Sequence, residues 1–122
     1  YRVVPLVGPS SILLSLMASG LNGQNFAFNG YLPVHKGERA KAISQLEKKV
    51  KNEQQTQIFI ETPYRNNQLI ADLLKTCSYS TLLCIAANIT GENELIATKS
   101  VGEWKKEVPD LHKQPAIFLI GN

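Results

Sequence analysis

Short apolar runs alternate with segments of helical periodicity along the whole chain, and this alternation limits the folds that it can adopt. Strands are predicted at residues 26–31, 56–61, 80–87, 94–100 and 115–120. Helices are predicted at residues 11–19, 36–52, 66–76 and 101–108. Because strands that alternate with helices are typical of a sheet covered on both faces, the sequence predicts an α/β fold, a three-layer sandwich whose five-stranded sheet is flanked by helices.

The sheet is predicted to be mixed. The stretches 80–87 and 94–100 are joined by a short connection, and close neighbours of this kind pair antiparallel. The chain has 122 residues, which is enough for one domain, and no linker-like segment divides it. We therefore expect a single domain over residues 1–122.

Several classes of function are disfavoured by what the sequence lacks. No apolar run approaches the roughly 18 residues that a membrane-spanning helix needs. Glycine-rich phosphate-binding, nucleophile-elbow and zinc-protease motifs are absent. His35 and His112 lie in polar stretches without a metal partner at helical spacing, so no metal site is expected. The net charge of +3 permits contact with RNA but does not by itself predict it.

Three further features have a structural interpretation. Cys77 and Cys84 lie in apolar stretches without metal-binding spacing, so we expect buried, reduced thiols and a cytoplasmic protein. Trp104 is interpreted as a core anchor. The charged segment 36–39 is interpreted as a solvated helix face, with contact to RNA phosphate as the alternative.

The residues Gly8, Pro9, Ser10 and Ser11 form the first candidate ligand-binding segment. They lead into the N-terminus of a predicted helix, whose free N–H groups suit a carboxylate or a phosphate. A tight start to the helix explains the same residues without any ligand.

A second candidate follows the predicted strand 56–61. Glu61, Thr62, Tyr64 and Arg65 bring a carboxylate, a hydroxyl, a phenol and a guanidinium together at the end of a buried strand. In open α/β sheets, ligands gather outside the carboxyl ends of strands. A helix cap by Thr62, with Pro63 at the first helical position, is the alternative, and the two interpretations are compatible.

Two more strand ends carry weaker signals. Small residues at 86–87 allow close approach of a ligand, and Asn88 and Thr90 supply polar groups, although a hairpin loop explains them as well. Small residues at the start of the strand 115–120 suit a flat heterocycle, and an ordinary core strand is the default interpretation.

Taken in order, these segments resemble the C-terminal half of the tetrapyrrole methylase superfamily. The most similar branch is that of the small-subunit ribosomal RNA 2′-O-ribose methyltransferases, which share the order of a Gly-Pro-Ser linker, a Ser-Gly-Leu step, a Phe-x-Phe strand, a Lys-Gly-x-Arg helix start, a Glu-x-Pro-x-Arg strand end and a closing apolar strand. The corresponding segments here are 4–11, 19–21, 26–33, 36–39, 59–65 and 116–121. The resemblance covers essentially the whole chain.

The resemblance implies S-adenosylmethionine as cofactor, bound in a cleft between two α/β domains, and a homodimer. Residues 1–122 would be the C-terminal half, the N-terminal domain would be absent from the chain, and the fragment alone would be inactive. The cofactor-binding residues implied are Gly8, Pro9, Ser10, Ser11, Glu61, Thr62, Pro115, Ala116 and Ile117.

The expected substrate is a ribose 2′-hydroxyl of small-subunit ribosomal RNA. Glu61 is the one candidate for a catalytic base, because a hydroxyl is a poor nucleophile without one. The residues assigned to substrate binding are Tyr64, Arg65, Asn88 and Thr90.

The chain also departs from this branch. Ala87, Asn88 and Gly91 stand where the branch has Arg, Glu and Lys, and Tyr64 stands where it has His. The loss of two cations weakens a contact with RNA phosphate. A corrin or porphyrin substrate is therefore one alternative, and a non-catalytic α/β interaction domain is the other.

Overall fold

The computed structural model describes residues 15–21, 23–88 and 94–121. Within these ranges the elements follow in the order β1 (Phe26–Tyr31), α2 (Lys36–Glu53), β2 (Thr56–Ile60), the 3-10 helix η1 (Pro63–Arg65), α3 (Asn66–Thr76), β3 (Leu82–Ala87), β4 (Leu95–Ser100), α4 (Val101–Lys106) and β5 (Ala116–Gly121). Residues 15–19 form a helical segment before β1. The predicted strands and helices are therefore confirmed within a few residues of their bounds, and residues 11–14 of the first predicted helix lie outside the described residues.

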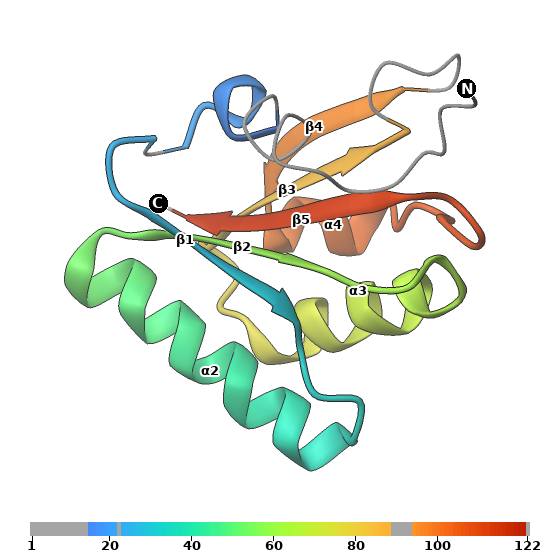
Figure 1. The fold of residues 1–122 in the computed structure, drawn as a ribbon, viewed down its shortest axis with the longest axis horizontal. Coiled ribbons are helices and arrows are strands. Elements are labelled where there is room, and N and C mark those ends of the chain that lie inside the picture. Colours follow the sequence, from blue (N-terminus) through green and yellow to red (C-terminus); the bar gives the residue numbers. More distant parts are fainter. Residues whose placement is uncertain (1–14, 22, 89–93, 122) are drawn as a thin grey trace, which may run out of the picture.

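The strands form one sheet of five in the order β1-β2-β5-β3-β4 (Figure 1). β1 pairs parallel with β2, whereas β5 pairs antiparallel with β2 and with β3, and β3 pairs antiparallel with β4. The predicted mixed sheet and the antiparallel pairing of β3 with β4 are confirmed. β5 follows the other strands in the sequence and yet occupies the middle of the sheet.

Helices cover both faces of this sheet. Helices α2, α3 and α4 lie on one face, and the helical segment 15–19 lies on the other (Figure 1). Because successive side chains of a strand point to opposite faces, Phe59 and Phe118 pack towards α2, α3 and α4, whereas Ile58 packs with Leu16 on the other face. The predicted three-layer sandwich is confirmed.

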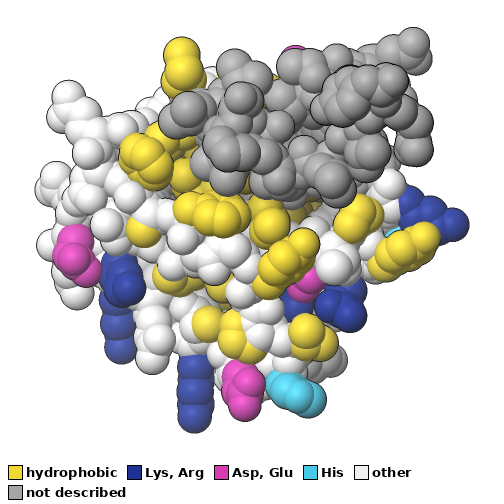
Figure 2. All heavy atoms as spheres, in the orientation of Figure 1, with side chains coloured by type: hydrophobic (Ala, Val, Ile, Leu, Met, Phe, Trp, Pro, Cys, Tyr) yellow, Lys and Arg dark blue, Asp and Glu magenta, His cyan; other side chains and the backbone are white. Residues whose placement is uncertain are grey.

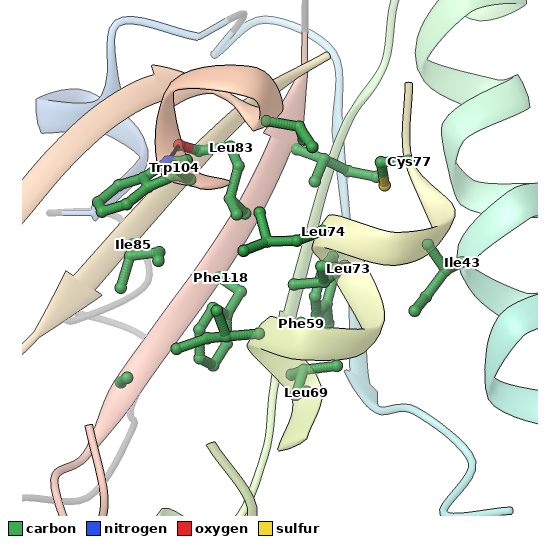
Figure 3. Close-up of a cluster of buried hydrophobic side chains, with 14 of the residues drawn as sticks. Ile43, Phe59, Leu69, Leu73, Leu74, Cys77, Leu83, Ile85, Trp104 and Phe118 are labelled. Carbon is green, nitrogen blue, oxygen red and sulfur yellow. Dashed lines mark hydrogen bonds between the residues drawn. The ribbon is translucent and has the colours of Figure 1, made fainter. Parts of the chain in front are cut away.

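The larger core lies between the sheet and helices α2, α3 and α4 (Figure 3). The rings of Phe59 and Phe118 stack with their centroids 6.2 Å apart. Trp104 is 3% exposed, and its indole N–H donates a hydrogen bond of 2.7 Å to the carbonyl of Leu83. The interpretation of Trp104 as a core anchor is confirmed.

The two cysteines are free and buried, as predicted. Burial, together with the nearby carboxylate of Glu47, raises the pKa of Cys77 to about 12, and burial also raises the pKa of Cys84. His35 and His112 are exposed. Among the described residues, no cluster of three or more His, Cys, Asp or Glu side chains could hold a metal ion, and no helix has the length and apolar character needed to span a membrane.

Strand β1 lies at one edge of the sheet and carries exposed aromatic side chains. Phe26, Phe28 and Tyr31 are 40%, 46% and 63% exposed. On the face shown in Figure 2, hydrophobic side chains gather across the middle and charged side chains lie mostly around the margin. Large hydrophobic side chains exposed on the edge strand of the described sheet favour coverage by another protein surface.

Candidate functional site

The sheet brings the predicted strand ends to one edge. β5 runs antiparallel to both β2 and β3, so its first residues lie beside the last residues of both strands. Ile60 of β2 is in register with Ile117, and Ala87 of β3 is in register with Ala116. We call residues 61–66, 86–88 and 110–117 at this end of the sheet the candidate edge.

The candidate edge contains most of the sequence-predicted site residues that the structure describes. It brings together Glu61, Thr62, Tyr64, Arg65, Asn88, Pro115, Ala116 and Ile117. The remaining predicted site residues, Gly8, Pro9, Ser10, Ser11 and Thr90, lie outside the described residues.

Small side chains form the strand ends at this edge. Ala86 and Ala87 are fully buried, and Ala116 is 2% exposed. Asn88 directly follows β3, and its backbone has a left-handed φ of 52°. Asn adopts this conformation more readily than most residues, which explains a polar residue directly after a buried strand.

Side-chain amides hold the loop before β5 against the start of α3. The Nδ2 of Asn66 donates to the carbonyls of Leu111 and Gln114, at 3.2 and 2.5 Å. The Oδ1 of Asn67 accepts a bond of 2.8 Å from the N–H of Leu111, and its Nδ2 donates to Asp110. The bond from Asn67, with the backbone N–H of His112, lowers the pKa of Asp110.

Backbone and amide bonds then join this loop to the other two segments. The N–H of Asn88 donates to the carbonyl of Pro115 at 2.9 Å, and its Nδ2 donates to Gln114 at 2.6 Å. The N–H of Lys113 donates to the carbonyl of Pro63 at 3.0 Å. The end of β2, the end of β3 and the start of β5 therefore form one connected structure.

One buried acceptor at the candidate edge has no partner among the described residues. Asn66 is fully buried, and its Oδ1 accepts no hydrogen bond there. A buried polar atom without a partner is costly, so such atoms are normally satisfied by water or by a ligand. Sequence reasoning missed Asn66, because a residue at the start of a helix is ordinarily explained as part of the cap.

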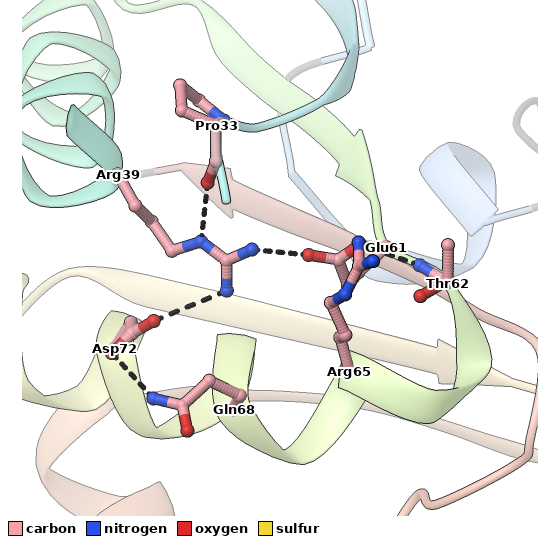
Figure 4. Close-up of polar contacts among 7 residues, drawn as sticks. All are labelled: Pro33, Arg39, Glu61, Thr62, Arg65, Gln68 and Asp72. Carbon is pink, nitrogen blue, oxygen red and sulfur yellow. Dashed lines mark hydrogen bonds and ion pairs between the residues drawn. The ribbon is translucent and has the colours of Figure 1, made fainter. Parts of the chain in front are cut away.

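A buried ion-pair cluster lies behind the end of β2 (Figure 4). Arg39 of α2 is 1% exposed, and its Nη2 contacts the Oε2 of Glu61 at 2.5 Å. Its Nε donates to the carbonyl of Pro33 at 2.8 Å, and its Nη1 reaches Asp72 at 3.3 Å. The Oε1 of Glu61 accepts the N–H of Thr62 at 2.8 Å.

The interpretation of segment 36–39 as a solvated helix face is wrong for Arg39. Residues 39, 43, 46 and 50 share one stripe of α2, and Ile43 and Val50 on this stripe are also buried. The helical spacing of Arg39 with Ile43 and Val50 therefore indicates burial, whereas its charge led to the prediction that it is exposed.

The helix cap predicted for the turn after β2 is only partly present. Pro63 begins η1, as predicted, but the side chain of Thr62 makes no cap hydrogen bond, so that part of the interpretation is wrong. Tyr64 is 70% exposed, and its ring meets His112 edge-on, with centroids 5.8 Å apart. The side chain of Arg65 is 50% exposed and lies 3.8 Å from Glu61.

The fold is that of an α/β domain found in a methyltransferase. It is similar to the solved structure described as the methyltransferase CobJ, with a TM-score of 0.58 and 17% sequence identity, over 91% of this chain and 47% of that chain. At this identity the likeness establishes the fold alone.

The sequence is similar to a more particular set of proteins. Ribosomal RNA small subunit methyltransferase I of Buchnera aphidicola subsp. Schizaphis graminum is 30% identical over 122 residues, which cover 98% of this chain and 41% of the relative. The protein of the same name in Escherichia coli O157:H7 is also 30% identical, with the same coverage. No family model matches the chain. The resemblance to the tetrapyrrole methylase superfamily and its ribosomal RNA branch is confirmed, and the chain spans about two fifths of the length of these curated relatives, 41% in both cases.

Proposed function

We propose that the chain is the C-terminal half of a two-domain, S-adenosylmethionine-dependent methyltransferase, and that the candidate edge is one wall of its cofactor site. The convergence of three strand ends at this edge carries the proposal. In open α/β sheets such an edge is where ligands bind. The similarity to ribosomal RNA small subunit methyltransferase I, at 30% identity over 98% of this chain, supports the same class of activity.

The residues of the edge suit this cofactor. Ala87 and Ala116 are small residues in register at neighbouring strand ends, which lets a ligand approach the backbone there, and the amides of Asn66 and Asn88 supply neutral polar groups. The unpartnered Oδ1 of Asn66 is an acceptor that fits a ligand N–H. When bound, the cofactor supplies an electrophilic methyl group bonded to a sulfonium. Ala87, Ala116 and the amides of Asn66 and Asn88 carry no charge, so this part of the edge does not repel that cation.

The chain's own contribution is to hold the cofactor in one position. The hydrogen-bonded segments around Pro63, Asn88 and Pro115 hold the wall in one shape, which favours transfer reactions that depend on orientation. We place Gly8, Pro9, Ser10 and Ser11 on the cofactor side of the site as well, on the resemblance alone.

We further propose ribosomal RNA of the small subunit as the substrate, in the cytoplasm. Tyr64 and Arg65 support this choice, because an exposed aromatic ring can stack on a base and a half-exposed cation can meet a phosphate. Lys113 adds a second cation, 5.9 Å from the centre of the Tyr64 ring. The alternative is a corrin or porphyrin substrate, which rests on the departures of this chain from the ribosomal RNA branch at Tyr64, Ala87 and Gly91.

The proposal includes a homodimer and an N-terminal domain. Both rest on the resemblance. The exposed Phe26 and Phe28 of β1 are consistent with a surface that another domain or subunit covers.

Calorimetric titration with S-adenosylhomocysteine tests the cofactor site. We expect micromolar binding by the longer protein and millimolar or weaker binding by residues 1–122 alone. Thr62→Val keeps the shape of the side chain and removes its hydroxyl, and we expect it to weaken binding about fivefold, the effect of one hydrogen bond. Tyr79→Phe, at an exposed position on another part of the surface, is the matched control. Absence of binding by the longer protein would favour the interaction domain.

Methyl transfer tests the substrate. The longer protein is incubated with radiolabelled cofactor and either small ribosomal subunits that lack the modification or uroporphyrinogen-type tetrapyrroles. We expect label in the ribosomal RNA, at a ribose hydroxyl. Label in the tetrapyrrole alone would establish the alternative substrate.

A further inference from the structure

The side chain of Arg39 joins three segments behind the candidate edge. Its guanidinium contacts the carbonyl of Pro33 before α2, Glu61 at the end of β2 and Asp72 in α3 (Figure 4). A buried guanidinium is costly unless all of its partners are well placed. Replacing a buried pair by apolar residues often leaves a protein equally stable, so the pair is better explained by the geometry that it specifies.

The contacts continue from Arg39 to the edge itself. The Oε2 of Glu61 faces Arg39, which leaves its Oε1 to accept the N–H of Thr62 at 2.8 Å. The carbonyl of Pro63, the residue after Thr62, accepts the N–H of Lys113 in the loop before β5. Hydrogen bonds on either side of the Thr62–Pro63 backbone therefore link α2 to the loop before β5.

The charges in this cluster balance. Arg39 and Arg65 face the carboxylates of Glu61 and Asp72. Both oxygens of the Glu61 carboxylate are engaged, and its side chain is only 2% exposed. A carboxylate held in this way is suited to fixing the backbone beside it.

From this geometry we propose that Arg39 is a positioning residue, which acts through Glu61 to hold the turn of Thr62 and Pro63 in the shape that the cofactor site needs. The inference rests on the proposed function, because the turn matters only if the candidate edge binds the cofactor. It gives Glu61 a role through the backbone of Thr62, where the sequence had offered it as a catalytic base.

A double-mutant cycle in the longer protein tests the inference. The variants are Arg39→Met, Glu61→Met and the double variant, and each is measured by thermal unfolding and by titration with S-adenosylhomocysteine. Each single variant takes away the shortest ion pair of the remaining buried charge, which keeps only the longer contact of Arg39 with Asp72 or of Glu61 with Arg65, and should unfold at a lower temperature. The double variant removes both charges and should recover most of the stability. Its affinity for S-adenosylhomocysteine should stay at least about tenfold below that of the wild type.

Two comparisons make the result specific. Trp104→Phe loses a buried hydrogen bond far from the edge, and we expect lower stability with unchanged affinity. Arg39→Lys keeps the charge but has no planar group that can reach three partners at once. We therefore expect it to bind S-adenosylhomocysteine more weakly than the wild type and to recover only part of the affinity that Arg39→Met loses.

The outcomes separate the possible failures. A double variant that binds S-adenosylhomocysteine like the wild type would overturn the positioning role. The positioning role would also be overturned if Glu61→Gln kept normal affinity while transfer was lost and the pH profile lost its acidic limb, because that is the behaviour of a catalytic base. If the wild type itself does not bind, the proposed function fails before the inference is reached.

Discussion

The indole of Trp104 and the carbonyl of Leu83 are joined by a hydrogen bond of 2.7 Å that ties α4 to β3. Trp104 is only 3% exposed, so water cannot replace the bond if the N–H is removed. We expect Trp104→Phe to lower the free energy of unfolding by about 1–3 kcal/mol, because a buried carbonyl loses a partner. Urea denaturation measures the change, and Tyr79→Phe, at an exposed position, should show almost none.

Removing one ring of the stacked pair Phe59 and Phe118 should lower the stability more than Trp104→Phe does. Phe118 is fully buried in the central strand, and removing its ring leaves a cavity that the surrounding β-sheet cannot fill. We expect Phe118→Ala to lower the free energy of unfolding by about 3–5 kcal/mol. Phe26→Ala removes the same ring from a position that is 40% exposed and should cost much less. Equal losses for the two variants would contradict the position of Phe118 in the core.

Replacing either of two glycines by alanine should change the stability in opposite directions, because their backbone conformations differ. Gly30 has a φ of +67°, and a Cβ at this position would meet no atom within 4 Å, so alanine there is strained by its backbone alone. We expect Gly30→Ala to cost about 1–2 kcal/mol. Gly37 lies in α2 with equal space around it, and Gly37→Ala should stabilise by about 0.4–1 kcal/mol. The melting temperatures of the two variants, measured against the wild type, should move in opposite directions.

Cys77 predicts a loss of stability at alkaline pH. Its pKa is raised from 9.0 to about 12 in the folded protein, mainly by burial, so the folded state disfavours the thiolate. The contribution to stability is complete below pH 9.0 and is lost as the pH rises towards 12, because only the unfolded chain releases the proton there.

The free energy of unfolding is measured by urea denaturation between pH 8 and 11, and it should fall less steeply with pH in Cys77→Ala than in the wild type. The difference between the two slopes should approach about 1.4 kcal/mol per pH unit, the value for release of one proton. Parallel curves for the two proteins would show that the thiol does not contribute.

Local pattern was enough to predict the elements of this fold. The helix 66–76 was predicted with the bounds that α3 has, because its apolar residues repeat at helical spacing and Pro63 marks the preceding break. The position of β5 between β2 and β3 could not be predicted in the same way, since strand order depends on contacts between distant segments.

The candidate site was predictable to a similar degree. Glu61 was selected because strand ends in α/β sheets bind ligands, and Ala116 was selected mainly through the resemblance to the methylase superfamily; the register places the end of β2 and the start of β5 at one edge. Arg39 and Asn66 were missed for different reasons. A charged side chain is ordinarily exposed, which concealed Arg39, and Asn66 bonds to a carbonyl 45 residues away, for which no local pattern exists.

The central position of β5 also bears on how the domain is made. β1 and β2 on one side, and β3 and β4 on the other, have no shared backbone pairing until β5 is inserted between them. During synthesis on the ribosome, the two halves of the sheet can therefore pair only after residues 116–121 have been made. A chain that stops before this strand should remain two separate ribbons with exposed edges, and would be a substrate for chaperones and proteases rather than a smaller version of the same domain.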